Sequence, residues 1–302
     1  MKLTFLGTSG GEGYPGLWCQ CEYCSYARTH GGKNHRENSS AVLDGDVLLD
    51  LNMTTFSQAY RLGMDISQAR TLLVTHPHED HFVAQHINWA RLPAAHPYAP
   101  GEDCSRREPA PCCSDLSPLR VMGTRHVLEA VSQGQASDSL QGRADLDWRS
   151  EKIAVDFTLA RPGVTVELGE DLRVTPLRSI HGPAEDYTVN YILQRGGKTL
   201  LYALDTGGYD DAMWEVLREF RYDAVVLEGT AGLSLAPNPQ HMNVEKLRRF
   251  FAALDEEALL TGKGQRILSH MAPHWTPPHD IFAPMMEREG ITVAYDGLTV
   301  EI

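Results

Sequence analysis

The chain of 302 residues is long enough for one large domain or two small ones, and its 42% hydrophobic and 22% charged residues are typical of a globular protein. Its 27 Lys and Arg residues against 40 Asp and Glu residues give a net charge of −13, which disfavours nucleic acids and other partners bound through many phosphates. No apolar run approaches the roughly 20 residues of a membrane span, and the run at residues 2–6 is too short for a signal peptide. We expect a cytoplasmic protein that acts on a small molecule without membrane contact, and leave a homodimer open.

Apolar periodicity predicts strands and helices in both halves of the chain. In the first half, we expect strands at 2–6, 40–43, 47–51, 71–74 and 119–122, and helices at 54–62, 82–92 and 124–131. In the second half, we expect strands at 153–159, 164–168, 172–177, 187–193, 200–204, 224–227 and 267–269, two closing strands, and helices at 210–220, 243–254 and 279–288. This order predicts an α/β (α+β) protein, an αββα sandwich with two packed sheets and helices outside.

Two segments lack this periodicity. Residues 93–118 contain six prolines and predict an inserted surface loop, whereas residues 132–150 are polar and predict a linker. Since the sequence shows no internal repeat and no low-complexity tract, we expect residues 1–302 to form a single domain.

The most informative segment follows the predicted strand at 71–74. It places four metal-ligand side chains within the six residues 76–81. In an extended chain, His76 and His78 share a face and can bind one ion together. Asp80 and His81 can turn towards a second ion where the next helix begins. Imidazoles and carboxylates are suitable ligands for zinc, and also for manganese or iron.

The pattern His76-x-His78-x-Asp80-His81 resembles the H-x-H-x-D-H signature of the metallo-β-lactamase superfamily. Three further residues follow apolar strands in the order that this family uses: His181, Asp205 and His270. The resemblance implies a metallo-β-lactamase fold with two catalytic ions. One would be held by His76, His78 and His181, the other by Asp80, His81 and His270, with Asp205 as the bridge. Asp50 is a candidate for orienting a ligand histidine, or equally a strand-end turn former.

In such a centre, two ions lower the pKa of a bridging water to about 7 and supply a metal-bridging hydroxide. The leaving oxygen also needs a proton. His241 lies just before the predicted helix 243–254 and is our candidate general acid, alongside Asp80 among the catalytic residues. The alternative for His241 is a surface or helix-capping histidine.

Three cysteines, Cys19, Cys21 and Cys24, lie within six residues on a predicted loop. Thiolates at this spacing can take three corners of a structural zinc site. With the glycine-rich opening at 7–11, they resemble the phosphoribosyl cyclic phosphodiesterase branch of the superfamily. The resemblance implies His274 as the fourth ligand. The sequence predicts no role for the other three cysteines: Cys104, Cys112 and Cys113.

These patterns predict a dinuclear metal-dependent hydrolase, with a phosphodiesterase of small phosphate esters, including cyclic ones, as the leading hypothesis. A hydrolase of lactones, thioesters or amides would use the same site, because the pocket sets the chemistry. Transfer-RNA processing is disfavoured by the negative charge. Binding without catalysis, as in the related cofactor-biosynthesis protein of pyrroloquinoline quinone, is disfavoured by the intact metal motif.

Overall fold

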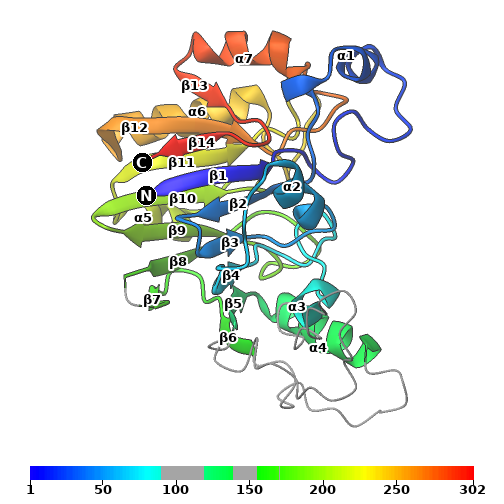
Figure 1. Cartoon of the computed structure of the whole chain (residues 1–302). Helices are drawn as coiled ribbons and strands as arrows, with labels where there is room; N and C mark the ends of the chain where they lie inside the picture. Colours follow the sequence, from blue (N-terminus) through cyan, green and yellow to red (C-terminus); the bar gives the residue numbers. More distant parts are fainter. Residues whose placement is uncertain (90–118, 139–154, 170) are drawn as a thin grey trace, which may run out of the picture.

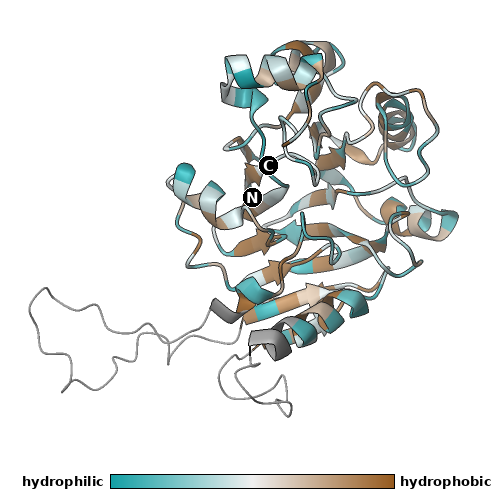
Figure 2. Ribbon diagram, turned by 90° about the vertical axis from the view of Figure 1, so that its right-hand side faces the viewer, coloured by the Kyte–Doolittle hydropathy of each residue, from teal (hydrophilic) through white to brown (hydrophobic). Residues whose placement is uncertain are grey.

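The computed structural model describes residues 1–89, 119–138, 155–169 and 171–302 (Figure 1). Within these residues, the strands form two sheets of seven strands each. The sheets pack face to face with helices on their outer sides, so the predicted αββα sandwich is confirmed (Figures 1 and 2). The predicted inserted loop at 93–118 lies outside the described residues.

The first sheet has the order β14-β1-β2-β3-β4-β5-β6. Its strands are β1 (Lys2–Gly7), β2 (Ser40–Leu43), β3 (Val47–Leu49), β4 (Thr71–Leu73), β5 (Leu119–Gly123), β6 (Val155–Leu159) and β14 (Thr299–Glu301). Strands β3 to β6 run parallel, whereas β14, β1, β2 and β3 pair antiparallel. The pairing of β1 with β14 brings the two ends of the chain side by side (Figure 1).

The second sheet has the order β13-β12-β11-β10-β9-β8-β7. Its strands are β7 (Val166–Glu167), β8 (Arg173–Arg178), β9 (Val189–Arg195), β10 (Lys198–Ala203), β11 (Tyr222–Glu228), β12 (Leu260–Ser269) and β13 (Ile291–Val293). Strands β10 to β13 run parallel. Each sheet therefore contains a parallel half whose strands end at the same edge.

The helices are α1 (Glu22–His30), α2 (Thr55–Arg61), α3 (Gln85–Trp89), α4 (Arg125–Asp138), α5 (Asp211–Arg218), α6 (Val244–Glu256) and α7 (His279–Glu287), with a 3₁₀ turn at Gly32–Asn34. Helices α5, α6 and α7 contribute buried side chains to the core on the outer face of the second sheet. Helices α3 and α4 do the same for the first sheet. The sandwich is therefore covered on both sides.

Strand periodicity explains how each sheet is apolar on both faces. In β10, Leu200 and Tyr202 point into the core between the sheets, while Leu201 and Ala203 point towards the helices outside. Successive side chains of a strand alternate between faces, so a continuous apolar run is what a doubly covered strand needs. Full burial of each large apolar side chain contributes about 1.5–3 kcal/mol relative to exposure.

Several bounds of the predicted elements differ from the structure, and three of these differences are large. The cysteine segment is not only a loop, because α1 begins at Glu22 and Cys21 caps its first turn by accepting a hydrogen bond from the Cys24 amide. The predicted linker starts too early, since α4 continues to Asp138. Strand β12 begins at Leu260 rather than at 267. In each case the missed residues are largely polar or partly exposed, so no apolar period marked them.

One buried hydrogen bond links the two sheets and can be tested. The Tyr191 hydroxyl on β9 donates to the Val74 carbonyl, 2.6 Å away, just beyond β4. We expect Tyr191→Phe to lower the free energy of unfolding by about 1–3 kcal/mol, because it leaves a buried carbonyl without this donor. Denaturant titration measures the change, with Tyr60→Phe at an 83% exposed position as the control. Equal stability of the two variants would contradict the prediction.

Candidate metal centre

Polar side chains gather at the edge where the parallel strands of both sheets end. Asp50 follows β3, His76 follows β4, Asp205 follows β10, Glu228 ends β11 and His270 follows β12. The carboxyl ends of parallel strands are common places for ligand sites in open α/β sheets, because several loops converge there. Residues far apart in sequence thus meet in one place.

The backbone is strained at three of these positions. Asp50, Asp205 and His270 have φ angles of 62°, 49° and 55°, in the left-handed region that residues other than glycine seldom adopt. Such conformations cost of order 1–3 kcal/mol each and persist where the surrounding structure holds them. Here they turn the chain sharply at the strand ends, so that each side chain reaches the centre.

His76, His78 and His181 form the first group of candidate ligands, with donor atoms within 4.8 Å of one another. His78 Nδ1 lies 2.8 Å from His76 Nε2 and 3.3 Å from His181 Nε2. Burial lowers the pKa of all three imidazoles. The rings are therefore neutral at pH 7 and present lone pairs, as metal binding requires.

Asp80, His81, Asp205 and His270 form the second group. Asp205 Oδ2 lies 2.5 Å from His81 Nε2, 3.4 Å from His270 Nε2 and 3.6 Å from His76 Nε2. Burial opposes the charge of Asp205, but His270 and His81 outweigh it and hold the pKa of this carboxyl well below its usual range. The carboxylate therefore lies between the two groups in its ionised form.

Four imidazoles of this centre share one arrangement: one nitrogen faces the cluster and the other faces a protein oxygen. These outward contacts are His76 Nδ1 to Thr75 Oγ1 (3.1 Å), His81 Nδ1 to Asp50 Oδ2 (2.7 Å), His181 Nδ1 to the Gln240 carbonyl (3.4 Å) and His270 Nδ1 to Thr230 Oγ1 (2.9 Å). Metal-binding histidines are usually oriented in this way. The donor set of nitrogens and carboxylates thus fits a pair of divalent ions such as zinc, manganese or iron.

His241 lies beside this cluster and is held by Glu228, which the sequence analysis missed. Glu228 is fully buried and accepts hydrogen bonds from the Thr206 and Thr230 amides. Its Oε1 lies 2.9 Å from His241 Nδ1. Burial opposes protonation of His241, but Glu228 outweighs it and raises the pKa of this imidazole to about 9. The sequence did contain a signal for Glu228, because it is an acidic residue at the end of an apolar strand. Asp205 follows β10 in the same way.

The loop that carries His241 is fixed by Lys246 in the first turn of α6. The Lys246 ammonium donates to the carbonyls of Gly207, Asn238 and His241 at 3.3, 2.6 and 3.2 Å. Gly207 permits the close approach of this loop, since a Cβ there would lie 1.6 Å from the Pro239 carbonyl oxygen. The Asp205 turn and the His241 loop are therefore packed backbone to backbone.

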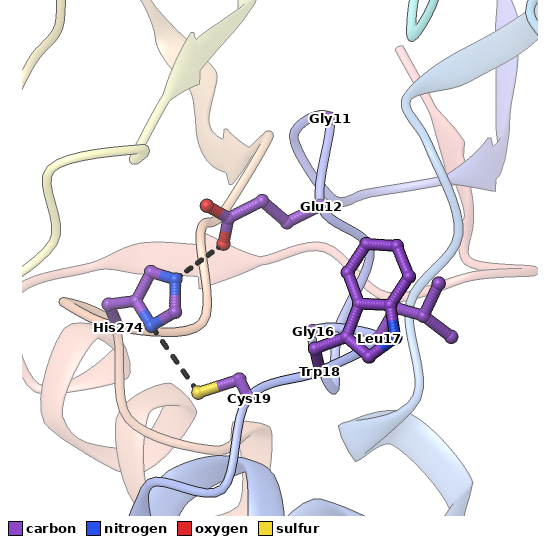
Figure 3. Close-up of a pocket in the computed structure, with 7 residues that line it drawn as sticks. All are labelled: Gly11, Glu12, Gly16, Leu17, Trp18, Cys19 and His274. Carbon is purple, nitrogen blue, oxygen red and sulfur yellow. Dashed lines mark hydrogen bonds and ion pairs between the residues drawn. The ribbon is translucent and has the colours of Figure 1, made fainter.

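Cys19, Cys21 and Cys24 lie apart from this centre, with their sulfurs within 4.8 Å of one another. His274 comes from the segment after β12, and its Nδ1 lies 3.5 Å from Cys19 Sγ (Figure 3). Its Nε2 lies 2.6 Å from Glu12 Oε2. The structure thus brings the three sulfurs together, and His274 approaches this group at Cys19. The other three cysteines lie outside the described residues.

A family model for the beta-lactamase superfamily domain matches residues 112–271, more than half of the chain. The chain therefore belongs to this superfamily, and its two sheets with outer helices have the metallo-β-lactamase fold. No curated protein sequence matches it. Among the residues that the structure describes, no helix is both long and apolar enough to cross a membrane.

Several solved structures have the same fold at low sequence identity. Zn²⁺-bound PqqB from Methylobacterium extorquens is 19% identical over 100% of both chains, with a TM-score of 0.72. A diphosphatase of the PhnP family is 20% identical over 100% of this chain and 97% of its own, with a TM-score of 0.66. The short form of human tRNase Z is 14% identical over 100% of this chain and 99% of its own, with a TM-score of 0.62. At these identities the similarity establishes the fold alone.

The packing of the two loops at Gly207 leads to a prediction. Gly207→Ala places a methyl group against the Pro239 carbonyl, so the loops must separate. We expect the free energy of unfolding to fall by about 1–3 kcal/mol, as for other overpacked sites. Thermal unfolding measures the effect against Gly262→Ala, because a Cβ at Gly262 meets nothing within 4 Å. If both variants melt at the same temperature, the close approach does not constrain the loops.

Proposed function

We propose that this protein is a dinuclear metal-dependent hydrolase, and specifically a phosphodiesterase of small phosphate esters. The observation that carries the proposal is the position of Asp205, whose carboxylate lies between two adjacent groups of imidazoles. We assign one ion to the first group, a second ion to Asp80, His81 and His270, and the bridge to Asp205. The two groups would thus serve one reaction.

Two ions bound there would lower the pKa of a shared water to about 7 and polarise the ester of the substrate. The residues of the chain keep this arrangement in place. Asp50 and Thr230 orient the rings of His81 and His270. The glycine-rich loop lies over the second group, since a Cβ at Gly10 would come within 3.2 Å of the His270 ring.

His241 supplies the proton that the leaving oxygen needs. Its Nδ1 is held by Glu228, so Nε2 is the atom that transfers the proton. The Glu228 carboxylate stabilises the protonated ring, and its own charge is supported by two backbone amides. Because Glu228 acts through His241, it is a positioning residue.

A phosphate ester is favoured over other substrates by two arguments. The combination of a Cys19, Cys21 and Cys24 cluster with an intact metal motif resembles the phosphodiesterase branch, and one similar structure is that of a diphosphatase. The net charge of −13 disfavours nucleic acid, so we propose a small-molecule substrate.

We further propose that residues 1–302 form one domain, because the core between the sheets draws side chains from both halves. A homodimer is an option that sedimentation analysis would settle.

The direct test compares metal content and hydrolysis in wild type and Asp80→Ala. We expect the wild type to bind two ions at this centre and to hydrolyse bis(p-nitrophenyl) phosphate faster than a lactone, a thioester or an amide. Asp80→Ala should lose about one ion and most of this activity, because the second group loses a carboxylate. The neighbouring, exposed Glu79→Ala provides the matched control.

Full activity of Asp80→Ala would contradict the two-ion mechanism. Preference for the lactone, thioester or amide would instead support another hydrolase on the same centre. Two bound ions without any hydrolysis would favour a binding protein.

A second prediction concerns His241→Ala. We expect phosphodiesters with alkyl leaving groups to be hydrolysed about 10²–10⁴-fold more slowly, because the leaving alkoxide lacks a proton donor. Esters that release p-nitrophenolate should lose much less, since this group leaves without a proton. Steady-state rates on both kinds of ester measure the difference. Equal losses would assign His241 to binding or structure.

We also propose that Cys19, Cys21, Cys24 and His274 hold a structural zinc ion. This ion would connect the start of α1 to the segment after β12 without contacting substrate. We expect a Cys19→Ser, Cys21→Ser variant to lose about one zinc per chain and to unfold at a lower temperature, because metal binding contributes to folding free energy. Elemental analysis of the variant provides the measurement, and unchanged zinc content would refute the site.

A further inference from the structure

Glu12 and His274 lie side by side in the wall of a pocket of about 460 Å³ (Figure 3). Glu12 Oε2 lies 2.6 Å from Nε2 of His274, whereas Nδ1 of the same ring lies 3.5 Å from Cys19 Sγ. The proposed zinc site uses His274 and Cys19 as ligands. Glu12 is not among the proposed ligands, and the proposed hydrolysis does not use it either.

The glycine-rich loop at residues 7–16 is bound to the segment after β12 on both sides of this pair. The Gly10 amide donates a hydrogen bond to the Met271 carbonyl at 3.1 Å. The buried Tyr14 hydroxyl donates to the Thr276 carbonyl at 2.9 Å. These two bonds flank the carboxylate on the loop and the imidazole on the other segment. The backbone therefore fixes the two side chains opposite each other.

The Glu12 carboxylate determines which nitrogen of the His274 ring carries the proton. A carboxylate only accepts hydrogen bonds, so the proton between the two groups belongs to the ring at Nε2. A neutral imidazole has one N–H and one lone pair, so the lone pair is at Nδ1. Nδ1 is the nitrogen that faces Cys19 Sγ. The ring thus has the tautomer and the orientation that a zinc ligand needs.

Backbone amides act on the three sulfurs in a comparable way. The Cys21 amide donates to Cys19 Sγ and the Cys24 amide to Cys21 Sγ, both at 3.5 Å. The Gly16 amide donates to Cys24 Sγ at 3.3 Å. Such bonds favour the charged form of the acceptor, which is the form that binds metal. Amides thus support the sulfurs of the proposed site, whereas a carboxylate orients its imidazole.

The alternative role for the contact between Glu12 and His274 is stability alone. Their side chains are 55% and 39% exposed. Exposed pairs of this kind contribute little to folding, because water screens them. The orientation of a ligand is a different effect, since its loss changes metal affinity and the hydrogen bonding of the ring.

We propose that Glu12 is a positioning residue of the zinc site, which holds His274 with its proton on Nε2 and leaves Nδ1 to bind the ion. The assignment rests on the zinc site proposed above, and it adds the orienting residue and the ligand nitrogen. Because Glu12 belongs to the glycine-rich loop, it also connects that loop to the zinc site.

The test titrates wild type and variants with cobalt(II) and then displaces the cobalt with zinc. Thiolate-to-cobalt absorption reports the cysteine site separately from the nitrogen and oxygen donors of the other centre. We expect Glu12→Ala to bind zinc there about 10- to 100-fold more weakly, as loss of an orienting partner does. Glu12→Gln should have an intermediate affinity, because its amide oxygen still accepts a hydrogen bond. The control is Glu22→Gln, at an exposed acidic residue next to Cys21, which should bind as wild type does.

Two further measurements separate orientation from other effects of the carboxylate. In a double-mutant cycle, Glu12→Ala should weaken zinc binding no further once His274 is replaced by Ala, because Glu12 acts only through this ring. In proton and nitrogen NMR spectra of the zinc-loaded wild type, we expect Nδ1 of His274 to be metal-bound and the Nε2 proton to be shifted downfield by its hydrogen bond. Glu12→Ala should lose this downfield shift.

Equal zinc affinity of Glu12→Ala and wild type would overturn the inference, as would coordination of the ion through Nε2. Additive losses in the cycle would also overturn it, because Glu12 would then act on the ion without His274. If wild type gives no thiolate-to-cobalt absorption, the proposed zinc site itself fails, and the inference fails with it.

Discussion

The buried Asp205 carboxylate lies within 3.6 Å of an imidazole nitrogen of His76, His81 and His270. A buried carboxylate without partners would strongly destabilise the fold. The charge of Asp205 is therefore compatible with burial because these imidazoles surround it. Because the Asp205 carboxylate contacts imidazoles of both ligand groups, the two groups share this residue. The position of one carboxylate therefore organises both halves of the candidate centre.

The fold supplies that position through its strand ends. Both sheets contribute parallel strands that finish at one edge, and left-handed backbone at Asp50, Asp205 and His270 directs their side chains inwards. The core on both faces of each sheet stabilises the domain enough to hold these strained residues. The free energy gained by burying the core thus offsets the cost of the strained backbone at the site.

Residues that are not candidate ligands fix the orientation of side chains and loops around the centre. Glu228 fixes His241, and Lys246 fixes the loop that carries it through three carbonyls. His274 contacts Cys19 and so connects the cysteine segment to the chain that follows β12. Loops from both halves of the sequence thus contact the candidate ligands. The side chains of these loops, rather than the fold, decide what can bind there.

The sequence by itself determined the αββα architecture and the local part of the site. Apolar runs in both halves indicated two doubly covered sheets, and His76, His78, Asp80 and His81 are neighbours in the chain, so their spacing alone brings them together. Only the tertiary structure placed Glu228 beside His241 and the backbone of Gly11 against Asp80. Those contacts join loops from different strands, whose approach depends on sheet order and on close backbone packing such as that at Gly207. Helix α1 was also not predicted from the sequence, because it buries few side chains and therefore shows no apolar periodicity.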